Sequence, residues 1–144
     1  MANNVQASRS KWVVLYDVLI SVSSPGVLND RQWQAFIKDL GSAPISKYLI
    51  GSLGTVQSSS VQRKQASDIL KSRGIRTAIM TDDTLVRGTV TAMNWLGANI
   101  DAFPWAKQKE ALKYLDIIGP AADEALDTLM RLRVEVETAA PIYL

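Results

Sequence analysis

Residues 75–97, IRTAIMTDDTLVRGTVTAMNWLG, decide the fold class of this chain. They begin with an apolar run that is typical of a buried strand. Thr81, Asp82 and Asp83 then offer side-chain oxygens that can cap a helix, and a helix dipole stabilises negative charge at its N-terminus. The apolar stripe that follows at helical spacing consists of Leu85, Val86, Thr89, Val90, Met93, Trp95 and Leu96. We therefore predict a strand within 75–83 and a helix over 83–96.

The same order of strand and helix occurs on both sides of this stretch. Upstream, KYLIGSLG (47–54) predicts a strand and SSSVQRKQASDILKSRG (58–74) a helix; downstream, ANIDAFPW (98–105) predicts a strand and AKQKEALKYLDI (106–117) a helix. The expected inward residues of these two helices are Val61, Ala66, Ile69, Leu70, Ala111, Leu112 and Leu115. Parallel strands need crossover connections, which helices supply, so the alternation predicts an α/β domain with a mostly parallel sheet.

The N-terminal part adds a strand region and one more helix. KWVVLYDVLISVSSPG (11–26) is rich in β-branched and aromatic residues and ends in a turn signal, so it predicts one long strand or a bent pair. In NDRQWQAFIKDLGS (29–42), Asn29 or Asp30 is the expected N-cap and Gly41 the expected stop of an amphipathic helix.

The C-terminal part predicts a further helix after Gly119 and Pro120. Its stripe of Ala122, Leu126, Leu129 and Val136 could cover the sheet or pack against a second subunit as a homodimer. We expect a flexible N-terminus over 1–10, an α/β domain over 11–117, and a C-terminal helix and tail over 118–144.

Composition excludes several classes of chemistry. The 144 residues include no cysteine and no histidine, which removes thiol nucleophiles, disulfides, the usual zinc sites and histidine acid–base catalysis. The net charge is only +2, so nucleic-acid binding gains little support. The main basic cluster, which reads as a solvated helix face, consists of Arg63, Lys64, Lys71, Arg73 and Arg76.

Membrane insertion is not expected. The N-terminus lacks the order of charged and apolar residues that a signal peptide has, and the longest apolar stretch, from Trp12 to Val22, is short and contains Asp17. We therefore expect a cytoplasmic protein.

Asp82, Asp83 and Arg87 are the candidate contacts to a partner or ligand. The two carboxylates follow a strand at the edge where open α/β sheets bind ligands, so a magnesium site or an acid–base pair is conceivable. Capping is the favoured role, because no histidine, lysine or Gly-rich phosphate loop accompanies them. Arg87 is expected to pair with Asp83 or to contact an anion or partner, and Gly88 to permit close helix packing. We predict no catalytic residue, no metal site and no cofactor.

Ser58, Ser59 and Ser60 are the candidate regulatory positions. They follow a predicted strand and open a helix, so their hydroxyls suit an N-cap. A phosphate on one of them would be accommodated by the helix N-terminus.

The segment 76–117 resembles the STAS domain class, the domains like anti-sigma-factor antagonists, and more closely the small bacterial STAS-like or SEC14-like proteins. The matching residues are Asp82, Leu85, Val86, Arg87, Gly88, Thr91, Ala92, Trp95, Ile100, Phe103, Ala111, Leu112 and Leu115. The resemblance extends over about 11–117. It implies a four- or five-stranded sheet with helices largely on one face, no enzymatic activity, and a role in protein regulation or ligand sensing. Family members with a phosphorylated serine carry it in a D-S-S-G loop, where this chain has Gln57 and Val61 around its serines.

The sequence thus predicts a non-enzymatic STAS-like signalling adaptor that binds another protein. The alternative is a small-ligand or lipid-binding module with a pocket between sheet and helices. A third hypothesis is a magnesium enzyme that uses Asp82, Asp83 and Asp101.

Overall fold

The protein folds around one five-stranded sheet. The computed structural model describes residues 5–95 and 97–144, and their side chains except those of 92–95. The elements are β1 (Ser10–Leu15), β2 (Val18–Ser23), β3 (Gly26–Val27), α1 (Asp30–Ser42), β4 (Lys47–Ser52), β5 (Val56–Gln57), α2 (Ser60–Ser72), β6 (Arg76–Met80), α3 (Thr84–Trp95), β7 (Ile100–Phe103), the 3-10 helix η1 (Trp105–Lys107), α4 (Gln108–Tyr114) and α5 (Pro120–Thr138). The sheet has the order β1-β2-β4-β6-β7, with β1 antiparallel to β2 and the other pairs parallel. The predicted α/β class with a mostly parallel sheet is confirmed.

The first two strands form a hairpin, so the bent pair is the correct alternative for residues 11–26. Leu15 pairs with Val18, which leaves Tyr16 and Asp17 as a two-residue loop. Tyr16 has a φ of 55°, and positive φ values are what two-residue hairpin loops need to match the twist of their strands.

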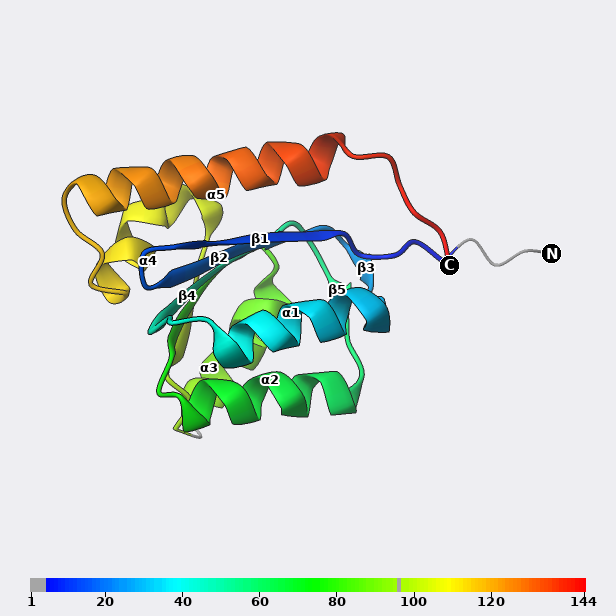
Figure 1. Ribbon diagram of the computed structural model, residues 1–144, viewed down its shortest axis with the longest axis horizontal. Coiled ribbons are helices and arrows are strands. Elements are labelled where there is room, and N and C mark those ends of the chain that lie inside the picture. The colour runs from blue at the N-terminus through cyan, green and yellow to red at the C-terminus, as the bar shows by residue number, and fades with distance from the viewer. Residues whose placement is uncertain (1–4, 96) are drawn as a thin grey trace.

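Both faces of the sheet are covered (Figure 1). The helices α1, α2 and α3 connect β2, β4, β6 and β7, and each connection moves in the same direction across the sheet. Because such crossovers share one handedness, the three helices must lie on the same face. The opposite face is covered by α5 over β1 and β2 and by α4 over β6 and β7. The expectation of helices mainly on one face holds for α1 to α3, but α4 lies with α5 on the other side.

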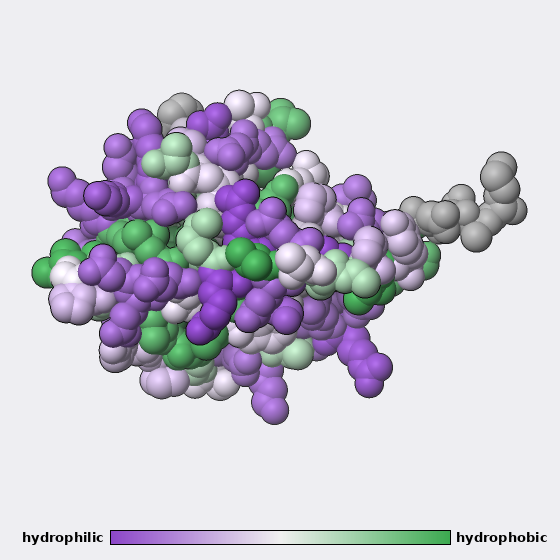
Figure 2. Space-filling model, turned by 90° about the horizontal axis from the view of Figure 1, so that it is seen from above, coloured by the Kyte–Doolittle hydropathy of each residue, from purple (hydrophilic) through white to green (hydrophobic). Residues whose placement is uncertain are grey.

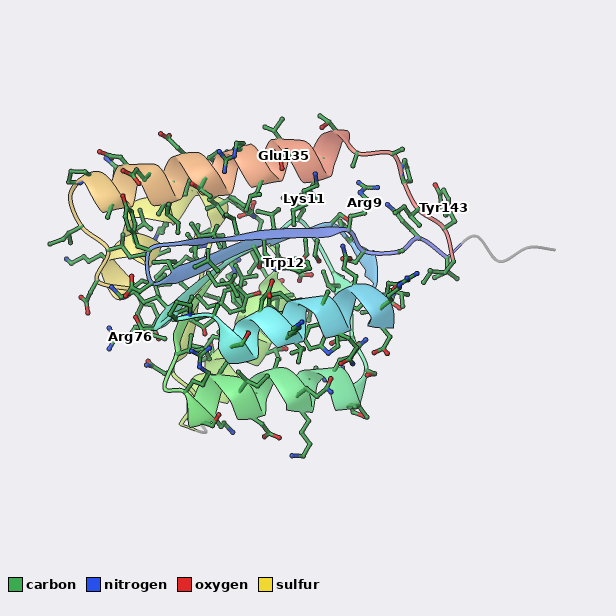
Figure 3. The ribbon with its side chains drawn as sticks, viewed as in Figure 1. Arg9, Lys11, Trp12, Arg76, Glu135 and Tyr143 are labelled. Atoms are coloured by element: carbon green, nitrogen blue, oxygen red, sulfur yellow. The ribbon has the colours of Figure 1, made fainter. Side chains whose placement is uncertain are left out.

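The two faces have separate hydrophobic clusters because strand residues alternate between them. On β2, Val18, Ile20 and Val22 pack toward α4 and α5, whereas Leu19 packs toward α1 with Phe36. Figure 3 shows the same alternation on β1, where Lys11 lies between the strand and α5 and Trp12 lies toward α1.

The C-terminal helix α5 is part of the core. It begins with Pro120 in the first helical turn, a position that tolerates the missing N–H. Leu129 and Val136 of the predicted stripe are buried, while Ala122 and Leu126 are half-buried against the same cluster. The outer face of the helix is mostly hydrophilic with small apolar areas (Figure 2). The stripe therefore covers the sheet, and a homodimer through this helix stays a prediction.

Residues 5–9 are packed, although they were expected to belong to a flexible N-terminus. Ala7 and Ser8 are buried, and the Ala7 N–H donates to the Ile142 carbonyl at 2.7 Å. Ala7 also bridges to Val27 of β3, which pairs with β5 in a small second sheet that the sequence did not predict.

Two details of the predicted helices are wrong. Gly41 lies inside α1, which continues to Ser42. Val61 is 66% exposed, because the first turn of α2 turns Gln62 inward, where its side chain accepts a hydrogen bond from the Ser59 N–H at 2.9 Å.

The inward stripe of α3 is narrower than predicted. Leu85 is 81% exposed and Thr89 is also exposed, while Val86 is half-buried and Val90 buried. Val86 and Val90 lie one helical turn apart on the same side of α3. They turn inward, so the inward face is narrower than the predicted stripe. The side chains of Met93, Trp95 and Leu96 lie outside the described part of the chain.

Candidate functional site

The carboxyl edge of the sheet gathers the residues that the sequence singled out. The loops after β2, β4, β6 and β7 leave the sheet there, and this is the edge at which open α/β sheets usually bind ligands. A hydrogen bond from Thr55 Oγ1 to Asp83 Oδ2, 3.0 Å long, joins the loop after β4 to the start of α3. Two cavities adjoin this edge, one on each side of the sheet, and both are lined in part by Ser52 and Gly54.

Asp83 is the capping residue of α3. Its Oδ1 accepts a hydrogen bond from the Leu85 N–H at 2.9 Å, and its own N–H donates to Thr81 Oγ1 at 3.1 Å. The hydrogen bond from Thr55, together with those from the helix backbone, lowers the pKa of the Asp83 carboxyl below its ordinary value. The favoured reading of Asp83 as a cap is confirmed.

Asp82 has a different role from its neighbour. Its Oδ1 accepts a hydrogen bond from the Trp105 N–H at 3.1 Å, so it holds the start of η1 rather than the start of α3. The two adjacent carboxylates therefore stabilise two different helices.

The three carboxylates of the magnesium hypothesis do not converge. Asp101 Oδ1 accepts a hydrogen bond from the Ala102 N–H at 2.8 Å, away from the bonds that Asp82 and Asp83 make. Across residues 5–95 and 97–144, no three acidic side chains lie close enough to hold a metal ion. The magnesium hypothesis therefore gains no geometric support.

Arg87 does not pair with Asp83. In the described part of the chain the guanidinium of Arg87 makes no ion pair, and the Asp83 carboxylate accepts hydrogen bonds from Thr55 and from the Leu85 N–H instead. The remaining hypothesis for Arg87, contact with an anion or partner, stays a prediction. Gly88 is exposed, and a Cβ there would meet no described atom of another element within 4 Å, so the structure gives no support to the close packing expected of it.

The three serines lie at the start of α2. Ser59 is the N-cap, and its Oγ accepts a hydrogen bond from the Gln62 N–H at 3.1 Å in a capping box. Ser58 lies beside Arg63, whose Nη1 is 3.4 Å from Ser58 Oγ and 2.6 Å from the Ser58 carbonyl. Ser60 is exposed in the first turn. Their regulatory role stays a prediction.

Two residues of the basic cluster, Arg73 and Arg76, bond to other parts of the fold. Arg73 donates to the carbonyls of Leu40 and Ala43, both at 2.6 Å, and Arg76 forms an ion pair with Asp116 at 3.2 Å. These bonds hold the loops between elements and engage two of the five cations of the cluster. The expectation that the protein does not bind nucleic acid stays a prediction.

Trp105 is an edge residue that the sequence reading did not single out. Its ring packs on Gly51, its Nε1 donates to the Ser52 carbonyl at 2.9 Å, and Arg133 of α5 stacks on it with 4.3 Å between the guanidinium carbon and the ring centroid. A Cβ at residue 51 would lie 2.8 Å from the Trp105 ring, so only glycine fits there. A glycine inside a predicted strand was the one available signal of this close approach.

The polar cavity on the α5 side has a volume of about 380 Å³ and contains Asp82 and Asp83. The cavity on the α1 side, about 230 Å³, is walled by aromatic residues that the sequence reading placed in elements but not in a site. These are Trp12, Trp33, Phe36 and Tyr48.

Comparison with solved structures identifies the fold. An uncharacterized protein of the DUF3478 family from Shewanella loihica PV-4, described as having a SpoIIAA-like fold, matches with a TM-score of 0.53. The two chains are 17% identical, and the match covers 80% of this chain and 98% of that chain. No family model and no curated protein matches. The chain thus has the SpoIIAA-like fold of the STAS class that its sequence resembles.

Within residues 5–95 and 97–144, no helix is both long enough and apolar enough to cross a bilayer.

Proposed function

We propose that this protein is a non-enzymatic regulatory domain of the STAS type that binds another protein at the carboxyl edge of its sheet. The observation that carries the proposal is Leu85, which lies in the first turn of α3 with 81% of its surface exposed. A second apolar side chain, Val61 in the first turn of α2, is 66% exposed. Exposed apolar side chains are suited to the core of a protein interface.

The charged residues on either side of Leu85 in the sequence, Asp83 and Arg87, suit the rim of such an interface. Arg87 carries a cation without an ion-pair partner among the described residues, and arginine is enriched at protein interfaces. Asp83 is held in place by Thr55 and by the helix backbone, so its charge has a fixed position.

The experiment is photo-crosslinking in the native host with a benzophenone amino acid at position 85. We expect one discrete crosslinked protein, and we expect the substitution Leu85→Asp to abolish co-purification of that protein. The matched control places the same crosslinker at Val134, which is 57% exposed on the outer face of α5. Equal crosslinking at both positions, or none at position 85, would reject the proposal.

We further propose that Ser58 is the regulatory position among the three serines. A phosphate there would lie beside Arg63 and would add negative charge next to the apolar side chains of the edge. The variant Ser58→Asp should lower the crosslinking yield at position 85, whereas Ser72→Asp at the other end of α2 should not. Phosphopeptide mapping of protein from the native host tests the modification itself. Phosphorylation at another residue, without phosphorylation at Ser58, would contradict the assignment of Ser58.

A further inference from the structure

The cavity on the α1 side of the sheet is built as a ligand site. It lies between the sheet, α1 and α3, with a volume of about 230 Å³. The cavity is open to solvent on one side and is smaller than a pocket for a drug-sized ligand. A few polar groups among apolar and aromatic walls are the usual lining of a small-molecule site.

The aromatic walls are rigid and present their apolar parts to the cavity. Trp12 Nε1 donates to Asp39 and Trp33 Nε1 to Gln65, both at 2.8 Å, so the polar atoms of both indoles are satisfied elsewhere. Phe36 packs on Trp12 with 5.4 Å between ring centroids and an interplanar angle of 78°. Rings fixed at such angles offer edges and faces to a further ring, which is the arrangement that aromatic groups prefer. Because the walls are held before binding, little ordering is needed when a ligand enters.

The charge of the lining determines the charge of the ligand. Among the described residues, those that line the cavity carry no charged side chain. Burial raises the pKa of Tyr48 well above its ordinary value, so its phenol stays neutral. A charged group inside the cavity would lose hydration without a compensating partner, and so the lining favours a neutral ligand.

The hydroxyl groups at the carboxyl end supply a few hydrogen bonds. Ser10 and Ser23 join their Oγ atoms at 2.7 Å, and Ser21 Oγ lies 2.8 Å from Tyr48 OH. A pair of hydroxyls uses one donor and leaves the second, together with spare lone pairs. Each pair can therefore still bind one polar atom of a ligand.

The volume sets the size of the ligand. An apolar protein cavity of about 150 Å³ holds benzene, which has six non-hydrogen atoms. The same packing in 230 Å³ accommodates about nine non-hydrogen atoms. We propose that this cavity binds one neutral, flat aromatic molecule of about that size, with its ring against Trp33 and Phe36 and a polar atom toward Ser23.

The test uses four probes on the full chain. Indole has the proposed size, shape and charge; 1-octanol has the same number of non-hydrogen atoms but is aliphatic; indole-3-carboxylate adds a negative charge and indole-3-carboxamide is its neutral counterpart. By ligand-observed NMR and calorimetry, we expect indole to bind with a Kd below about 1 mM. We expect 1-octanol to bind at least tenfold more weakly than indole, and the carboxylate at least tenfold more weakly than the carboxamide.

Two variants locate the binding. Val86→Phe introduces a ring into the cavity from α3 and should weaken indole binding at least tenfold, whereas Val134→Phe on the exposed face of α5 should not change it. Ser23→Ala removes one hydroxyl from the cavity and should weaken indole binding several-fold. This variant locates the binding if Val86→Phe does not fold. In wild-type protein, intermolecular NOEs from indole to Trp33 or Phe36 give the position directly.

Four results would overturn the proposal. If indole shows no measurable binding at 10 mM, the cavity is not a binding site. If indole gives NOEs only to residues outside the cavity, it binds elsewhere. If 1-octanol binds as tightly as indole, the site takes an acyl chain rather than an aromatic ring. If the carboxylate binds as tightly as the carboxamide, the preference for a neutral ligand is wrong.

Discussion

The two faces of the sheet are built from the same strands but differ in where space remains. The α5 face is filled over the strands, and its cavity of about 380 Å³ lies mostly among the loops at their carboxyl ends. On the α5 face, Val22 and Trp105 pack around Gly51 so closely that a Cβ on the glycine has no room. On the α1 face, the neighbouring positions along β2 and β4 carry Ser21, Ser23 and Ser52, and a cavity of about 230 Å³ remains over the strands themselves. The same strands therefore allow different packing on their two faces: the α5 face is closely packed over the strands, and the α1 face leaves space there at some cost in stability.

Removing a side chain from the filled face should have the largest effect. Leu129 of α5 is fully buried, so Leu129→Ala loses the transfer free energy of its atoms and leaves a cavity; we expect a loss of about 2–5 kcal/mol in the free energy of unfolding. Urea denaturation followed by circular dichroism measures it. Val134→Ala on the exposed side of the same helix should change stability by less than about 0.5 kcal/mol. Equal effects would mean that α5 is not part of the core.

Adding a single carbon to the filled face should have the next largest effect. Gly51→Ala places a Cβ 2.8 Å from the Trp105 ring and should cost about 1–3 kcal/mol of unfolding free energy. In a double-mutant cycle, Trp105→Phe should cost less in the Gly51→Ala background than alone. The matched control is Gly41→Ala inside α1, where the nearest atom is Ile69 Cδ1 at 3.9 Å. That change should stabilise the protein by about 0.5–1 kcal/mol, and a cost at both positions would contradict the close fit at Gly51.

The same enlargement should have opposite signs on the two faces. Val86→Ile adds one methylene beside the cavity and should raise the free energy of unfolding by roughly 0.8 kcal/mol, the value of a buried methylene. Val22→Ile adds the same group to the filled face and should lower it by about 1 kcal/mol. Thermal and urea unfolding of both variants give the comparison. Equal signs would show that the two faces are packed alike.

The smallest effect concerns the edge where the two faces meet. The pKa of Asp83 is lowered in the folded protein, so its carboxylate contributes stability above the unfolded value of 3.8, and this contribution is lost as the pH falls through the folded pKa. Between about pH 5 and pH 3, the urea midpoint of Asp83→Asn should therefore fall less steeply than that of the wild type. Thr55→Val, which removes the donor to Asp83, should reduce the steepness partly. Parallel pH profiles for wild type and Asp83→Asn would contradict the assignment.

Much of the fold could be predicted because its information is local. The strands β4 and β6 are short apolar runs, and the helices before and after β4 carry the caps Asn29 and Ser59 at the expected positions. Short connections then leave a mostly parallel sheet as the consistent arrangement. Two details were missed for different reasons. The inward turn of Gln62 depends on a capping box with Ser59, which the apolar pattern does not show. The burial of Ala7 depends on contacts with β3 and the C-terminal tail, which are distant in the sequence.

The candidate site was predicted less completely. In the sequence, Asp82 and Asp83 are equally good candidates for the cap of the same helix. The fold places Trp105 close to Asp82, so Asp82 binds the start of η1 and Asp83 caps α3. The cavity could not be predicted, because apolar periodicity shows that Trp33 and Phe36 face inward but not that the volume between them and β4 is unfilled. Serines alternating with apolar residues over 21–23 of a buried strand were a signal of a polar group on one face.

The pairing of the two ends of the chain has a consequence for engineering. Leu144 N–H donates to the Val5 carbonyl at 2.7 Å, so the described ends of the domain lie side by side (Figure 1). A few added residues would join them, and new ends could be opened between Tyr16 and Asp17 at the hairpin loop. The resulting circular permutant would begin with β2 and end with β1, and it would keep the sheet and both of its faces.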